Sequence, residues 1–246
     1  MDHRRTAMVT GTLFVITFVA AVAAVLMYGS VLSDPNYVVG PGADGRVKLG
    51  AFLEVILILA NVGTAVTLYP IVKRQHESVA IGYVAARVLE SAIIAVGIFS
   101  LLSIVTLRQE FGGTAGAGAA SFVTAARSMV AFHDWTFLLG PGFLAGVGNG
   151  ILLGYLMYRS RLVPRGMAML GLIGGPLVAV SGVAVLFGLY EQVSGWSFIA
   201  TLPEMLWEGS LGIYLIVRGF SSSAIRSLEL AGVERTGTPP VLAAVG

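Results

Sequence analysis

The sequence predicts an all-α integral membrane protein with six transmembrane helices. The chain has 246 residues, of which 56% are hydrophobic and only 11% are charged, and its mean hydropathy is +0.87. A soluble domain of this size is typically about one quarter charged. Because so few charges cannot cover a water-facing surface, soluble enzymes, disordered regulators and collagen-like proteins are excluded, and a polytopic membrane protein remains.

Six apolar runs are long enough to cross a bilayer. Each has at least about 18 residues, which is enough to span a hydrocarbon core of roughly 30 Å. The runs are continuous rather than alternating, which favours helices over the strands of a membrane barrel. We expect membrane helices at 10–32, 49–71, 81–106, 131–158, 166–190 and 203–220.

The first of these runs has some features of a cleaved signal peptide. Arg4 and Arg5 precede it, and the Ala-Val-Ala sequence at 21–23 resembles a cleavage site. The apolar stretch nevertheless continues past that site to Leu32. This continuation favours a retained membrane anchor.

The fourth helix has a glycine at every fourth position and a proline near its middle. The glycines are Gly142, Gly146, Gly150 and Gly154. Such a stripe lets another helix backbone approach closely, which is a common mode of packing in membranes. Pro141 lacks the N–H that would bond the Phe137 carbonyl, so we predict a kink at 140–142.

Two segments outside the apolar runs are expected to be irregular. The 107–130 connection contains the sequence GGTAGAGAA, which is typical of a flexible low-complexity loop. The tail at 221–246 contains serine and proline and lacks a helix-length apolar run. We therefore expect a membrane domain at 1–220, followed by a mostly disordered cytoplasmic tail.

Lysine and arginine are distributed unevenly between the two sides of the predicted bundle. Ten lie on one side: Arg4, Arg5, Lys73, Arg74, Arg159, Arg161, Arg165, Arg218, Arg226 and Arg235. Four lie on the other side: Arg46, Lys48, Arg108 and Arg127. Because cytoplasmic loops are enriched in these residues, both termini are expected in the cytoplasm, with the chain in the cell (inner) membrane. An even number of helices agrees with this arrangement.

The net charge and the ratio of lysine to arginine indicate which partners the protein has and which kind of organism it comes from. The net charge is +2 and its basic residues are spread over several loops, so no nucleic-acid partner is expected. Only Lys48 and Lys73 are lysines among the 15 basic residues, a bias typical of a GC-rich, bacterial genome. Membrane lipid is therefore the one partner that the composition implies directly.

An inner layer of polar residues lies within the apolar runs, roughly 9–15 Å from the cytoplasmic helix ends. It contains Asn61, Arg87, Glu90 and Asn149. An ionisable residue at the centre of a membrane helix costs about 2.5–3.5 kcal/mol to insert. Arg87 and Glu90 share a helix face at i,i+3 and can pair, facing the two amides rather than lipid. The layer is either structural glue or a polar pocket that recognises a ligand headgroup or relays a proton.

An outer layer contains Glu54, His133, Asp134, Glu191, Glu204 and Glu208. The Thr-Leu-Pro-Glu sequence at 201–204 fits a capping box, so Glu204 is expected to cap its helix. Asp134 is expected to cap a helical segment that starts at Trp135, and Glu191 is expected to be solvated. Glu54 and Glu208 each lie about one turn inside a helix and lack such an explanation.

Metal and cofactor sites are not expected. One histidine with carboxylates could bind a divalent metal, but neither an HExxH motif nor a pair of spaced histidines supports this. The chain has no cysteine, which excludes thiolate sites. Three tryptophans near the outer boundary are expected to form an interfacial belt. They are Trp135, Trp196 and Trp207.

Several stretches of the chain resemble a known bacterial membrane family. They are DPNYVVGPGADGRVKLGAFLEVILILANVGTAVTLYPIVKRQ, GYVAARVLESAIIAVGIFSLLSIVTLRQ, HDWTFLLGPGF, LLGYLMYRSRLVP, LFGLYEQ and WEGSLGIYLIVRGF. From about Thr6 to Phe220 the chain resembles the family catalogued as domain of unknown function 4386. The resemblance implies a six-helix integral membrane protein and implies no activity.

The candidate ligand-binding residues are Glu54, Asn61, Arg87, Glu90, His133, Asp134, Asn149 and Glu208. The leading hypothesis is a membrane protein that binds, transports or senses a small molecule or lipid through these buried layers. One alternative is an intramembrane enzyme that uses His133 with nearby carboxylates. Another is an assembly partner without a ligand. No inverted repeat is visible, so a complete carrier of this length would need to form a homo-oligomer.

Overall fold

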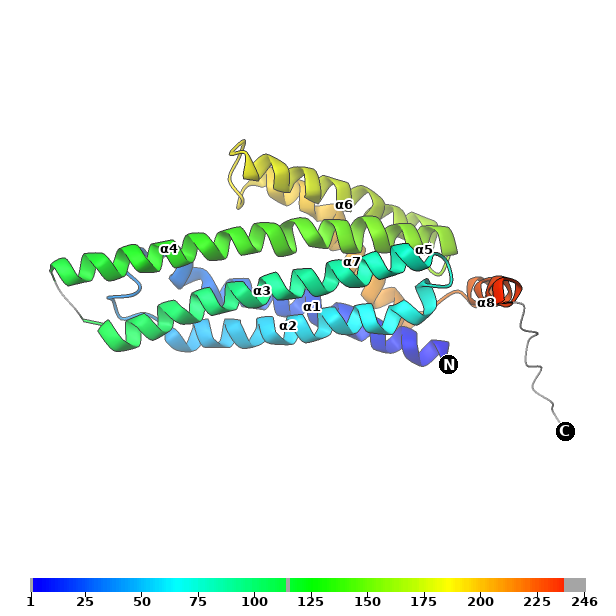
Figure 1. Ribbon diagram of the computed structural model, residues 1–246, viewed down its shortest axis with the longest axis horizontal. Coiled ribbons are helices and arrows are strands. Elements are labelled where there is room, and N and C mark those ends of the chain that lie inside the picture. Colours follow the sequence, from blue (N-terminus) through cyan, green and yellow to red (C-terminus); the bar gives the residue numbers. More distant parts are fainter. Residues whose placement is uncertain (1, 114–115, 237–246) are drawn as a thin grey trace.

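The computed structural model describes residues 2–113 and 116–236, and every regular element within these ranges is helical. The elements are α1 (His3–Ser33), α2 (Asp44–Val72), α3 (Glu77–Phe111), α4 (Ala117–Leu139), the π-helical segments η1 (Gly140–Leu144) and η2 (Gly146–Leu153), α5 (Gly154–Ser160), α6 (Arg165–Leu186), α7 (Gly195–Val217) and α8 (Ser222–Thr236). Figure 1 shows a long helical bundle, with α8 and the N-terminus at the same end.

Five helical stretches are long and apolar enough to cross a membrane, which indicates a multi-pass membrane protein. They are His3–Ser33, Asp44–Val72, Glu77–Phe111, Gly118–Ser160 and Arg165–Leu186. The sixth predicted span corresponds to α7, which is not one of the five. Its 23 residues include two glutamates and a proline.

The prediction of a flexible loop at 107–130 is wrong for most of its length. α3 continues to Phe111 and α4 begins at Ala117, while residues 114–115 lie outside the described part of the chain. Ala126 is buried in a core cluster with residues of α3, and the Phe122 ring stacks on that of Phe111 at 4.3 Å. The 35 residues of α3 measure about 52 Å at 1.5 Å per residue, which exceeds a hydrocarbon core.

The kink predicted at 140–142 is instead a change of winding, from α-helix to the two π-helical segments. The N–H of Ala145 bonds the carbonyl of Gly140, five residues earlier. Proline has no N–H to donate, and wider turns accommodate that loss within a continuous helix. Figure 1 shows α4, this segment and α5 as one long rod.

Gly146, Gly150 and Gly154 of the glycine stripe pack against α6, which confirms the close contact with another helix that their spacing predicts. A Cβ on Gly150 would lie 2.3 Å from the Cα of Gly175, and a Cβ on Gly146 would lie 2.8 Å from the Gly175 carbonyl oxygen. Neither distance leaves room for a side chain. The two backbones are therefore in direct contact.

The expectation that residues 221–246 are mostly disordered is wrong for 222–236, which form α8; residues 237–246 lie outside the described part. The apolar side chains of Ala224, Ile225 and Leu228 are buried against the bundle. They recur over a single turn, too short a pattern to be detected as a membrane span. α8 is therefore a surface helix docked on the end of the bundle.

Polar contacts also tie α8 to the N-terminus. Glu229 accepts a hydrogen bond from His3 at 3.0 Å and lies 3.3 Å from Arg74. The hydrogen bond from His3, together with Arg74, holds the pKa of Glu229 below its usual range. Arg4 donates to the Ile216 carbonyl at 2.7 Å, so the ends of α1, α7 and α8 meet.

Candidate functional site

Arg87 lies at the centre of a polar cluster that we call the inner cluster. Its members are Asn61 from α2, Arg87 and Glu90 from α3, Asn149 from η2, and Glu204 and Glu208 from α7. Arg87 is only 2% exposed. Its Nη1 lies 2.9 Å from Glu90 Oε2 and 3.9 Å from Glu208 Oε1. The predicted i,i+3 pair is thus formed, and its guanidinium also faces a second helix.

Two amides extend the inner cluster. Asn149 donates a hydrogen bond to Glu208, and Asn61 donates to Ser91 Oγ at 3.1 Å. The indole of Trp207 donates to the backbone carbonyl of Asn149 at 3.1 Å. Arg87, Glu90 and both amides are buried, so the pair faces the bundle rather than lipid.

Glu204 is not a helix cap, and sequence reasoning missed it as a member of the cluster. The N-cap of α7 is Ser194, whose side chain accepts from the Ser197 N–H at 3.3 Å, so Glu204 lies well inside the helix. It is 4% exposed, and neither carboxyl oxygen has a hydrogen-bond partner within the described ranges. The local Thr-Leu-Pro-Glu pattern resembles a capping box but lies within a continuous helix.

A signal for Glu204 was present in the spacing of α7. Glu204, Trp207, Leu211 and Leu215 lie three or four residues apart and are all buried. This spacing marks the inward face of a helix. The same face makes Trp207 a core residue, fully buried, rather than part of an interfacial belt.

The inner cluster contains more acidic groups than basic ones. Three carboxyl groups surround one guanidinium. Several buried polar atoms of the cluster also lack a hydrogen-bond partner among the described residues, namely Asn61 Oδ1, Arg87 Nε, Asn149 Oδ1 and both Glu204 carboxyl oxygens. Buried polar atoms in proteins nearly always have a hydrogen-bond partner, so these unpartnered atoms call for an explanation.

A cleft of about 810 Å³, which we call the outer cleft, lies toward the opposite end of the bundle from α8. It is bounded by α1, α2, α4 and the connection between α6 and α7. Its polar wall contains Glu54, His133 and Tyr28. Apolar lining residues include Val25, Leu32, Phe137, Leu138, Val185 and Leu189.

Two glycines allow close packing around the polar wall of the outer cleft. The Tyr28 hydroxyl donates to Glu54 Oε2 at 2.6 Å, and its ring meets that of His133 edge-on at 5.8 Å. A Cβ on Gly50 would lie 2.5 Å from the Tyr28 ring, and a Cβ on Gly97 would lie 2.6 Å from Thr136 Oγ1, one turn along α4 from His133. Both glycines let helices approach closely enough to bury these side chains.

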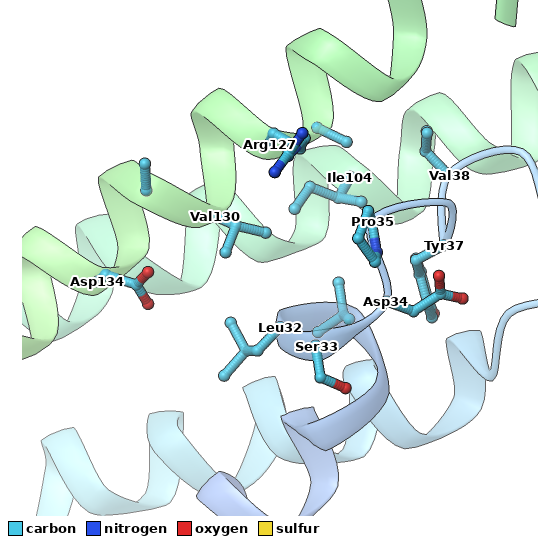
Figure 2. A pocket seen from close by; sticks show the side chains of 13 residues that line it. Leu32, Ser33, Asp34, Pro35, Tyr37, Val38, Ile104, Arg127, Val130 and Asp134 are labelled. Carbon is cyan, nitrogen blue, oxygen red and sulfur yellow. The ribbon is translucent and has the colours of Figure 1, made fainter. Parts of the chain in front are cut away.

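Asp134 is exposed and is not a cap, because α4 begins 17 residues before it, at Ala117. Its Oδ1 lies 3.7 Å from His133 Nδ1, too far for a hydrogen bond. It lines both the outer cleft and an adjoining cavity of about 420 Å³. Figure 2 shows Arg127, Val130 and Asp134 on α4, across this cavity from Leu32 of α1.

A polar network lies beside the adjoining cavity, which Tyr37 lines. The Tyr37 hydroxyl donates to Asp44 at 3.1 Å, and Arg108 lies 2.7 Å from the same carboxyl group. Burial, together with the hydrogen bond to Asp44, raises the pKa of Tyr37 to about 12. The loop between α1 and α2 is thereby fixed against α3.

The family assignment rests on a match over nearly the whole membrane part. The family model described as Domain of unknown function (DUF4386) matches residues 9–219. The chain belongs to this family. No curated protein and no solved structure matches the chain. The resemblance found in the sequence motifs is therefore confirmed, and every candidate residue lies within the DUF4386 match.

The structure of this DUF4386 protein divides the predicted site residues into two groups. Glu54, His133 and Asp134 meet at the outer cleft, which Glu191 also lines. Glu208, which the sequence places in the outer layer, instead joins the inner cluster. α7 begins at Gly195 rather than at 203, so Glu208 lies deeper in its helix than expected. Among the described residues, no three His, Asp or Glu side chains are arranged so that they could hold a metal ion together.

Proposed function

We propose that this DUF4386 protein binds a small amphipathic molecule or a lipid in the outer cleft. The supporting observation is a cleft of about 810 Å³ with the buried Glu54 and His133 in its wall. Ligand sites typically measure about 300–1,000 Å³ and combine an apolar lining with a few polar groups. Sensing and transport would both begin with this binding step.

The lining of the outer cleft suggests how such a molecule would lie. Phe137, Val185 and Leu189 offer an apolar surface to a hydrocarbon body. Glu54 and His133 offer hydrogen bonds to a polar head. His133 Nδ1 is buried and has no hydrogen-bond partner among the described residues, so a hydrogen bond from a ligand would satisfy it.

The proposal includes six membrane spans with both termini in the cytoplasm. α7 is 23 residues long, about 35 Å, and packs against α1 and α6. The N-terminus, α8, the α2–α3 turn and the α5–α6 turn lie at one end of the bundle (Figure 1), and most of the lysines and arginines lie in or next to these segments. Basic residues favour the cytoplasmic side of a membrane.

Topology reporters check this arrangement. A reporter fused after Phe220 is expected to be active in the cytoplasm, because six crossings return the chain to its starting side. A reporter inserted in the 112–116 connection is expected to be active outside. Activity of the Phe220 fusion outside the cell would contradict the six spans. It would also contradict the depths in the membrane at which we place the inner cluster and the outer cleft.

Ligand binding is tested on protein purified in nanodiscs of defined lipid, with bound molecules released and quantified by mass spectrometry. Ala131→Trp should abolish binding, because Ala131 lines both the outer cleft and the adjoining cavity, and the larger side chain would fill this space. Glu54→Gln should weaken binding several-fold by changing the polar wall. Ala120→Trp, at an exposed position on the same helix, is the matched control and should bind as the parent does.

The same measurement separates binding from a purely structural role. A molecule present in equal amount in the parent, Ala131→Trp and Ala120→Trp would be annular lipid, and the outer cleft would then not be a site. A preparation without any bound molecule under every lipid composition would also contradict the proposal and would favour an assembly role.

A further inference from the structure

We propose that Glu204 is a proton-binding site in the centre of the bundle, with Arg87 as the counter-charge to its ionised form. This site is separate from the outer cleft and does not depend on the ligand proposed there. It lies where η2, α6 and α7 meet, among residues that the proposed binding function leaves unused.

The first support is the surroundings of the Glu204 carboxyl group. It lies in a niche made by glycines: a Cβ on Gly150 would lie 2.6 Å from Glu204 Oε2, and a Cβ on Gly174 would lie 2.9 Å from it. The residue is 4% exposed, and both carboxyl oxygens lack a partner among the described residues. An ionised carboxylate would be enclosed there without a hydrogen-bond donor among the described residues, whereas the acid form carries no net charge.

The second support is the set of charges that face Glu204. Its own helix contributes Glu208, and α3 contributes Arg87 and Glu90. η2 contributes the amide of Asn149 and the backbone at Gly150, and α6 contributes only glycine backbone. α1 packs on α7 about two turns further along, where Gly11 and Phe14 contact Gly212. With three carboxyl groups to one guanidinium, a proton on Glu204 brings the cluster closer to neutrality.

Arg87 is placed to respond when that proton leaves. Its Nη1 lies 2.9 Å from Glu90 on its own helix and 3.9 Å from Glu208 on α7, and its Nε has no partner among the described residues. Loss of the proton leaves a carboxylate on α7 and adds attraction on that side. The guanidinium then moves from Glu90 toward α7, which couples proton binding to the contact between α3 and α7.

The test uses the full-length protein in nanodiscs and the hydrophobic reagent dicyclohexylcarbodiimide. The reagent takes up the proton of an acid in apolar surroundings, the carboxylate adds to its central carbon, and rearrangement leaves a stable N-acylurea. Peptide mass spectrometry should locate this adduct on Glu204 at neutral pH. Labelling should decline as pH rises, because the acid form is lost.

Infrared spectra of the same samples supply an independent measurement. Wild type should show the carbonyl band of a protonated carboxylic acid, and Glu204→Gln should lose it together with the adduct. Glu191→Gln removes an exposed carboxyl group and should retain both. Ligand occupancy of the outer cleft should be unchanged in Glu204→Gln, which separates this proposal from the function proposed above.

Two results would overturn the proposal. One is an adduct on other carboxyl groups only, with an acid band that persists in Glu204→Gln. The other is wild-type protein with neither an adduct on Glu204 nor an acid band at any pH, a result that needs no variant to fold.

Discussion

Arg87→Met is expected to lower the free energy of unfolding by about 3–5 kcal/mol, the usual cost of stranding a buried charge. Arg87 is fully enclosed and lies near carboxyl groups on two helices, Glu90 and Glu208. Removing the guanidinium leaves these acids buried without a counter-charge. Thermal unfolding in detergent, followed by intrinsic fluorescence, measures the effect.

The coupling between the two partners distinguishes a buried pair from two independent residues. Arg87→Met combined with Glu90→Leu should be less destabilising than the sum of the two single changes, because neither charge is left alone. Arg159→Met, at an exposed position near the end of α5, is the matched control and should change stability by no more than about 0.5 kcal/mol. If Arg87→Met and Glu90→Leu were each as stable as the parent, the pair would not be buried.

Gly150→Ala is expected to destabilise the bundle by about 3 kcal/mol, at the upper end of the cost of overpacking. The added Cβ would lie 2.3 Å from the Gly175 Cα and 2.7 Å from its nitrogen, both backbone atoms that cannot rotate away. α6 must therefore move off η2 or the chain must fail to pack. The yield of monodisperse protein on size exclusion and its melting temperature both report this.

Gly209→Ala is the matched control for the glycine prediction. Gly209 also lies inside a helix, α7, but a Cβ there meets nothing within 4 Å. Because alanine is a better helix former, this change should stabilise by about 0.5–1 kcal/mol. Equal stability of the Gly150 and Gly209 variants would mean that the close crossing of η2 and α6 is absent.

The parts of the fold that sequence reasoning found depend on short-range periodicity. Long apolar runs predict membrane helices without any knowledge of their neighbours. The Arg87–Glu90 pair follows from i,i+3 geometry alone, and the contact of Gly146 and Gly150 with another helix follows from their four-residue spacing. Such features are properties of one helix.

The parts that sequence reasoning missed depend on where helices begin and on what lies across from them. A capping motif misplaced the start of α7, and this error moved Glu204 and Glu208 to the wrong depth. Glycines near 112–118 suggested a loop, although Ala126 packs against α3 and continues the helix. The outer cleft brings together Tyr28, Glu54 and His133 from three helices, an arrangement that no local pattern encodes.

The π-helical winding between α4 and α5 sets the rotational phase of the whole rod. An uninterrupted α-helix turns about 100° per residue, so the 16 steps from His133 to Asn149 would leave their side chains about 160° apart. In a π-helix each residue rotates the chain by less than about 100°. This smaller rotation from Gly140 onward brings the side chains of His133 and Asn149 to the same, inward side of the rod. A helical wheel drawn from the sequence would put one of the two in lipid. The winding is what lets a single rod supply a wall of the outer cleft and a donor to Glu208.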